Sequence, residues 1–174
     1  GDPALAQAPG VRLWLDRVQE AMLRVFARSN LYNALATVYE ELGVFGTGAL
    51  LILEDDEEIV RAWPLTVGEY WLASSDRQVV NTLYREFPLT VFQLVERFGR
   101  EAVSPLVREQ YDAGTWDREV TVVHAIEPNE GRDLERADNR NMAFRSVYYE
   151  KAGADECLLA VSGFESFPAM CPRW

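Results

Sequence analysis

Three glycines lie within six residues of the segment "GVFGTGALLIL", residues 43–53, and Thr47 lies between the last two. Glycines beside a hydroxyl side chain can form a loop whose backbone N–H groups bind phosphate. Such a loop requires the order strand, glycine turn, helix, because the helix N-terminus must meet the phosphate. Here a predicted helix precedes the glycines, a strand follows them, and no Lys completes a P-loop. The order therefore indicates a turn into a core strand.

Each glycine of this turn has an expected conformational role. Gly43 is predicted to take the left-handed conformation that stops the preceding helix. Gly46 and Gly48 are predicted to permit tight bending and close approach of the backbone to a neighbour.

Two charged segments are candidate binding sites. The acidic run at residues 54–58 could hold a divalent cation, but it lacks the spaced ligands and central glycine of a calcium loop, so we favour a solvated hairpin tip. Arg132, Arg136 and Arg140 are spaced by four and could line a helix that contacts nucleic acid. Acidic residues alternate with them, however, and we interpret residues 129–142 as a mobile surface loop.

The residues give no catalytic constellation. His124 is the only histidine, and in the strand pattern "VTVVHAI" it shares a face with Val120, Val122 and Ile126, as a packed residue would. No triad can be assembled around it, and no pair of carboxylates is marked by its spacing. We therefore assign no catalytic, cofactor-binding or metal-binding residue and expect no enzyme.

Composition narrows the possible classes further. The 174 residues fit one domain, and the 28 acidic against 17 basic side chains give a net charge of −11, which disfavours a general nucleic-acid-coating domain. Cys157 and Cys171 are expected to be free thiols. No apolar run reaches the roughly 20 residues that span a bilayer, so no membrane partner is expected. The initial Gly and the abrupt end "CPRW" suggest a piece of a longer protein, with residues 1–10 as a flexible leader.

The periodicity predicts helices first and strands afterwards. A helix is expected over residues 11–28, with these apolar positions at helical spacing: Val11, Trp14, Leu15, Val18, Met22, Val25 and Phe26. A second helix is expected over residues 31–42, with Ser29 or Asn30 as its N-cap. Next come two hairpins, residues 49–54 with 59–67 and residues 70–74 with 79–89.

The remaining segments mix short helices with strands. Thr90 and Gln93 have the spacing of a capping box, which predicts a short helix closed by Gly99. Ser104 and Pro105 predict another short helix. A strand at residues 118–127 and a final hairpin, residues 143–153 with 156–164, complete the order. This order of helices and strands indicates an α+β fold: an N-terminal helical pair, then a mainly antiparallel sheet with short interspersed helices.

The segments taken together are more specific than any one of them. "SNLYNALATVYEELGVFGTGALLILEDD", "PLTVGEYWLASSD", "VNTLYREFPLTVFQLVERFG" and "VSGFESFPAMCPRW" resemble, in order, the head-to-tail connector (portal) proteins of short-tailed bacteriophages and prophages. The resemblance runs from about Trp14 to Trp174. The residues that carry its motifs are Ser29, Asn30, Gly43, Gly46, Thr47, Gly48, Thr90, Gln93, Pro172, Arg173 and Trp174.

The resemblance implies a structural, non-catalytic component of a phage portal. Such proteins form a homo-oligomeric ring at the capsid vertex of the virion, assembled in the host cytoplasm. DNA is packaged and ejected through this ring, which meets terminase, capsid or scaffold proteins and tail proteins. Family members are much longer than this chain and continue into stem and clip regions, so the resemblance implies a wing-region fragment. Residues 129–142 match no family element.

Two other functions remain open. One is a protein-binding adaptor domain whose aromatic strands contact a partner. The other is a nucleotide- or metal-dependent hydrolase that uses the glycine turn and the acidic run.

Overall fold

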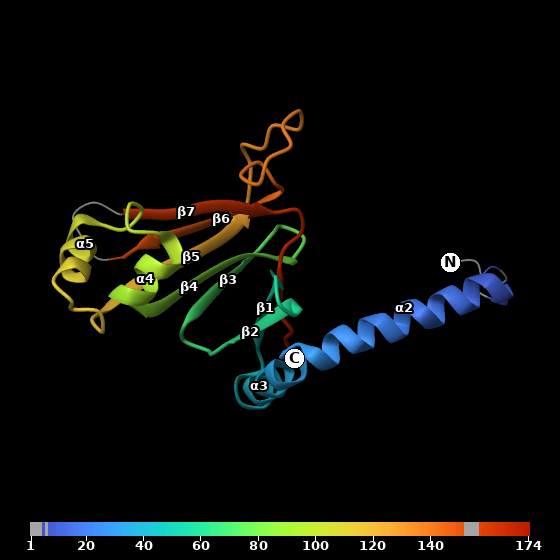
Figure 1. The fold of residues 1–174 in the computed structure, drawn as a ribbon. Coiled ribbons are helices and arrows are strands. Elements are labelled where there is room, and N and C mark those ends of the chain that lie inside the picture. The colour runs from blue at the N-terminus through green and yellow to red at the C-terminus, as the bar shows by residue number, and fades with distance from the viewer. Residues whose placement is uncertain (1–4, 6, 152–156) are drawn as a thin grey trace. The chain divides into compact units, whose positions relative to one another are not determined.

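The computed structural model describes residues 5, 7–151 and 157–174 and has an α+β fold (Figure 1). The predicted fold class is confirmed, but the strands form two sheets where one was expected. The chain divides into two compact units, Gly1–Leu65 with Ala169–Trp174, and Thr66–Pro168, which are described separately below. No helix in the described part of the chain is long and apolar enough to cross a membrane.

The first unit begins with two helices, as predicted. Helix α2 spans Pro9–Arg28 and starts two residues before the expected position, with Pro in its first turn. Proline is tolerated there because the N–H that it lacks would have no partner within the helix. Helix α3 spans Leu31–Phe45 and continues three residues beyond its expected end.

The sheet of the first unit has the order β2-β1-β8. Strands β1 (Ala49–Asp55) and β2 (Ile59–Leu65) form the predicted hairpin, and β8 (Ala169–Met170) pairs with β1 from the other end of the chain. The pairing of β8 was not expected, because a two-residue strand has no periodicity to detect. The core under this sheet contains Ala34, Val38, Leu50 and Ala62.

The second unit contains a five-stranded antiparallel sheet in the sequential order β3-β4-β5-β6-β7 (Figure 1). Its strands are β3 (Tyr70–Ser74), β4 (Val80–Thr90), β5 (Glu119–Pro128), β6 (Phe144–Glu150) and β7 (Cys157–Phe164). The hairpin β3–β4 and the final hairpin β6–β7 are confirmed. Residues 152–156, which the final hairpin prediction included, lie outside the described residues.

Two short helices supply much of the core of the second unit. Helix α4 spans Val91–Phe98 and helix α5 spans Pro105–Asp112, where the Thr90 and Ser104 signals predicted them. Their apolar side chains pack with Val103, which lies between the two helices in sequence, and with residues of β5, β6 and β7 in one cluster: Val91, Leu94, Val95, Val103, Val107, Val122, Tyr148 and Leu159. Residues 129–142 contain no helix, so the arginines spaced by four in that loop do not line a helical face.

Candidate functional site

Two of the sequence motifs meet in the first unit, although they lie at opposite ends of it in sequence. The Gly48 N–H donates to the Pro172 carbonyl, and the Trp174 N–H donates to the Gly46 carbonyl, each at 3.1 Å. Thr47 and Arg173, between these residues, form an isolated antiparallel bridge. We call this arrangement of residues 46–48 and 172–174 the C-terminal clasp.

The clasp also completes the end of helix α3. The Trp174 indole N–H donates to the Leu42 carbonyl at 2.8 Å, and the Gly46 N–H donates to the same carbonyl at 3.0 Å. The last four carbonyls of a helix have no partner within the helix. The Leu42 carbonyl, one of these four in α3, thus accepts two hydrogen bonds, one from the C-cap Gly46 and one from a residue 132 positions later in the chain.

The glycines of the clasp are required by geometry, but the prediction for Gly43 was wrong. Gly43 lies inside α3, and the left-handed C-cap is Gly46, with φ of 69°. The helix continues past Gly43 because that residue keeps a helical conformation, and Val44 and Phe45 add to the last turn. At Gly48 an added Cβ would lie 3.1 Å from Val38 Cγ1 and 3.4 Å from the Val38 carbonyl oxygen. The close approach expected at this glycine is confirmed.

Ser29 and Asn30 join elements of the first unit, but the expected side-chain cap at Asn30 does not form. The Asn30 amide instead donates to the Ala62 carbonyl at 2.7 Å and accepts from the Ala62 N–H at 2.9 Å. One side chain thus satisfies both backbone groups of a residue in β2 and fixes the start of α3 to the sheet. Ser29 Oγ donates to the Phe26 carbonyl at 3.0 Å and accepts from the Leu31 N–H at 3.2 Å.

Thr90 and Gln93 belong to the second unit and form the predicted capping box. The Gln93 N–H donates to Thr90 Oγ1 at 3.2 Å, and the Thr90 N–H donates to Gln93 Oε1 at 3.0 Å. The box fixes the point at which β4 becomes α4, so that Val91 and Leu94 of the helix are fully buried. The motif residues therefore form two separate sets of contacts. The clasp and the Asn30 contact join elements of the first unit, and the capping box begins a helix of the second.

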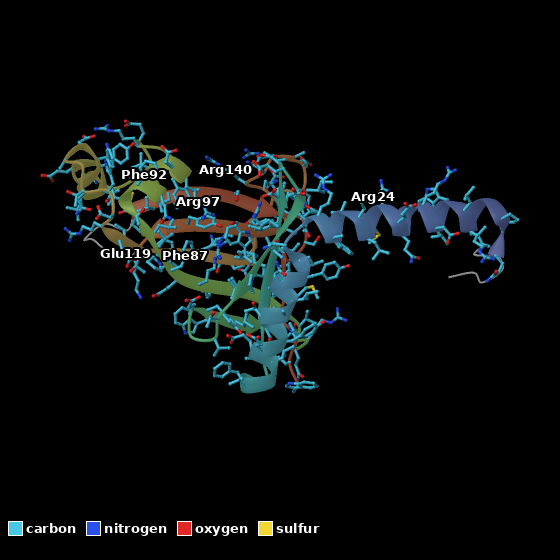
Figure 2. All side chains as sticks on the ribbon, turned by 60° about the horizontal axis from the view of Figure 1, so that its bottom comes forward. Arg24, Phe87, Phe92, Arg97, Glu119 and Arg140 are labelled. Atoms are coloured by element: carbon cyan, nitrogen blue, oxygen red, sulfur yellow. The ribbon has the colours of Figure 1, made fainter. Side chains whose placement is uncertain are left out.

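His124 is fully buried, as its strand pattern predicted. Its ring stacks on Tyr148, with centroids 3.8 Å apart and planes inclined by 10°. Arg85 Nε donates to Nδ1 at 3.3 Å, so Nδ1 carries no proton, and Nε2–H donates to Ser146 Oγ at 2.8 Å. Arg97, labelled in Figure 2, donates to the Tyr148 hydroxyl at 3.2 Å and lies 4.9 Å from the centre of the same ring.

This arrangement makes His124 a poor acid or base. Burial, followed by the charges of Arg85 and Arg97, lowers the pKa of His124 from 6.5 to about 2. Burial also lowers the pKa of Arg85. The imidazole is therefore neutral near pH 7 and has both nitrogens engaged, which agrees with a packing role and not with proton transfer.

A buried carboxylate escaped the sequence prediction. Glu150, at the end of β6, is 1% exposed, and its Oε1 accepts from the Ser104 N–H at 2.8 Å. Ser104 Oγ in turn accepts from the Val107 N–H at 3.3 Å and caps α5. Glu150 could have been suspected from the strand register, because it lies on the same face as Tyr148 and opposite Val122.

The acidic run forms a turn. Asp55 Oδ1 accepts from the N–H groups of Glu57 and Glu58, and Oδ2 accepts from Arg61 Nε at 2.8 Å. The Arg61 hydrogen bond is the main cause that lowers the pKa of Asp55. Among the described residues, no group of three or more His, Cys, Asp or Glu side chains is placed to hold a metal ion.

Two of the three candidate arginines form ion pairs, and both candidate thiols are partly buried. In the loop at residues 129–142, Arg132 pairs with Glu165 at 2.9 Å and Arg136 with Asp138 at 3.0 Å. Cys157 and Cys171 are free thiols and half-buried. Burial raises the pKa of Cys171 to about 11 and also raises that of Cys157, so both thiols are mainly protonated near pH 7.

The best-defined contacts of the motif residues are thus those of a structural α+β module: backbone junctions, a helix cap and an inter-element amide bridge. The family model described as "Bacteriophage head to tail connecting protein" matches residues 1–174. The chain belongs to this family, and the resemblance found in its sequence is confirmed.

Two curated relatives agree with this family. The chain is 48% identical over 173 residues to a "Probable portal protein" of Bordetella phage BPP-1. It is 43% identical over 173 residues to a "Portal protein" of Salmonella phage epsilon15. Each match covers 99% of this chain but 31% of the relative, so the chain spans about a third of the length of these relatives.

Proposed function

We propose that residues 1–174 form the wing region of a phage portal, a structural ring component through which DNA is packaged and ejected. The observation that carries this proposal is the match of the whole chain to the connector family, together with two relatives named as portal proteins. The match to about a third of each relative supports a region of a larger subunit.

The proposed role is non-catalytic. The groups most suited to chemistry are engaged elsewhere: His124 is buried and stacked on Tyr148, and Asp55 holds the β1–β2 turn. The motif residues support a structural role because they join α3, β1, β2 and the last residues of the chain.

The proposed partners follow from a portal role. They are further portal subunits in a homo-oligomeric ring, terminase, capsid or scaffold proteins, tail proteins, and DNA that passes through the ring without sequence preference. The location would be the portal vertex of the virion, after assembly in the host cytoplasm. The net charge of −11 supports a surface along which DNA slides without sticking, because an acidic surface repels the phosphate backbone.

Electron microscopy of the full-length protein tests this proposal. We expect ring-shaped particles with a central hole, and a purely monomeric particle would contradict the portal role. The non-catalytic assignment has its own test, the melting temperature with and without Mg²⁺ and nucleotides. We expect no specific increase, since a ligand that binds the native state raises its stability.

A further inference from the structure

Helix α2 is amphipathic, yet the described residues of its own unit leave its apolar face only partly covered. The α2 stripe consists of the seven apolar residues at helical spacing: Val11, Trp14, Leu15, Val18, Met22, Val25 and Phe26. None of the twenty residues of α2, all of them described, is buried, and Trp14 is 61% exposed. Figure 2 shows side chains standing out around this helix, with Arg24 labelled. Because most helical stability in proteins comes from packing of such a face, the stripe indicates a partner.

The charge of α2 is opposite to that of the rest of the chain. The helix has four arginines against Asp16 and Glu20, a net charge of +2. The whole chain carries −11, so the residues outside α2 carry −13. An apolar stripe on a basic helix is complementary to an apolar patch on an acidic surface.

Two of the four arginines are already paired within the chain. Arg24 pairs with Glu20 at 3.1 Å, and Arg28 pairs with Glu58 at 3.4 Å. Arg12 and Arg17 form no ion pair with any residue that the structure describes. Asp16 is likewise without an ion pair among the described residues, so the unpaired charges in the N-terminal half of α2, beside Trp14 and Leu15, sum to +1.

We propose that the α2 stripe docks onto the acidic surface outside α2 of a second copy of this chain, as a contact between neighbouring subunits. Pairing of one α2 with another would bring two helices of charge +2 together, which the charges oppose. Docking of α2 onto the remainder of another copy, where the residues outside α2 sum to −13, is favoured by the same charges. Charge thus selects between the two ways in which a second copy can cover the stripe.

A contact of this kind joins two different surfaces. Such a heterologous interface propagates head to tail and gives a ring when the rotation between subunits closes. The inference therefore rests on the proposed ring and names one of its contacts. A 20-residue helix is about 30 Å long, and one of its faces is smaller than the roughly 800 Å² per partner of a standard interface. The contact is accordingly weak between two isolated chains and is strengthened by closure of the ring.

Photo-cross-linking in the full-length protein tests the contact. A benzophenone amino acid replaces Trp14 in one sample and Leu13 in a matched control, and rings are assembled from mixed ¹⁴N- and ¹⁵N-labelled subunits. Leu13 is also exposed, but it lies off the stripe, about 100° around the helix from Trp14 and about 160° from Leu15. We expect mixed-isotope cross-links from position 14 to peptides outside α2, and few from position 13. Cross-links within a single isotope, or between two α2 helices, would overturn the proposal.

Two Leu→Gln variants give a second measurement with closely matched chemistry. Leu15→Gln should raise the protein concentration needed for half-maximal ring assembly by about tenfold, the effect of losing one buried leucine. Leu13→Gln should leave that concentration nearly unchanged, and far-UV circular dichroism checks that both variants fold. Equal effects of the two variants would overturn the proposal. Rings that form without cross-links from position 14 would leave the portal role intact and refute only this contact. A full-length protein that forms no rings refutes both.

Discussion

Each of the two units of the chain is stabilised internally by a different kind of contact. The core of the first unit contains small side chains such as Ala34 and Ala62, and its ends are joined by backbone hydrogen bonds of the clasp. The second unit has eight clustered apolar residues in its core, together with the buried polar side chains of His124 and Glu150.

The difference shows where each unit is vulnerable. A junction built from backbone groups at close approach depends on residues that lack a side chain, so an added Cβ is the damaging change. A packed cluster of large side chains depends on filled volume, so a removed side chain is the damaging change. Most of the connector motif residues belong to backbone junctions of this kind. Gly46 and Gly48 allow the backbone to turn and to approach its neighbours closely, and Asn30 binds the backbone groups of a strand residue.

The largest effect is expected from a cavity in the second unit. Leu94 of α4 is fully buried, so Leu94→Ala should lower the free energy of unfolding by about 2–5 kcal/mol, measured by urea denaturation. Leu106 of α5 is 57% exposed and is the matched control, with an expected change of about 0.5 kcal/mol or less on substitution by Ala. Equal losses for both variants would show that the α4–α5 cluster is not the core of this unit.

A change in the clasp should have an intermediate effect. Gly46→Val places a β-branched residue at φ of 69°, beside Trp174, and should cost about 1–3 kcal/mol of stability. Gly43→Ala is the control within the same helix. It adds a Cβ that meets no atom within 4 Å, so it should stabilise the protein by up to about 1 kcal/mol. Opposite signs in the thermal or urea midpoints would establish that Gly46, and not Gly43, ends the helix.

The same contrast explains how much could be predicted from the sequence. The hairpins, the capping box and the buried face of β5 depend on neighbouring residues, and the sequence predicted them. The prediction that the helix ends at Gly43 was wrong because each of the three glycines within six residues satisfies the local rule for a helix end. The long-range contacts that the chain makes at Gly46 come from residues 172–174, and the Trp174 indole that binds the Leu42 carbonyl is 132 residues away in sequence.

The site residues follow the same division. Thr90 and Gln93 act on each other across three positions, so their role was predictable. Asn30 reaches Ala62 in a strand 32 residues away, and a local cap was the only role that its neighbours could suggest. Glu150 binds the N–H of Ser104, and strand alternation gives no sign that a buried carboxylate will find such a donor. Long-range polar pairs are therefore the part of the site that the sequence does not reveal.

The last expected effect concerns the buried polar cluster of the second unit and depends on pH. The pKa of His124 is about 2 in the folded chain, whereas an ordinary histidine, as in the unfolded chain, has a pKa of 6.5. Between pH 6.5 and pH 2 the unfolded chain therefore binds a proton on this histidine that the folded chain does not bind. The stability contributed by the neutral histidine is complete above pH 6.5 and is lost as the pH falls towards 2, by up to about 1.4 kcal/mol per pH unit. His124→Gln should flatten the decline in urea stability between pH 6.5 and 4.5.

A control in the other unit makes this measurement specific. His124 is the only histidine of the chain, so Gly46→Val, although less stable at every pH, should keep the full histidine contribution to the slope. Carboxylates contribute equally to both variants and cancel when the slopes are subtracted. Identical slopes for the two variants would mean that His124 takes up its proton in the folded state as well, which its stacking on Tyr148 and its hydrogen bond from Arg85 oppose. A difference confined to His124→Gln would assign this acid sensitivity to the side-chain-packed unit and not to the clasp.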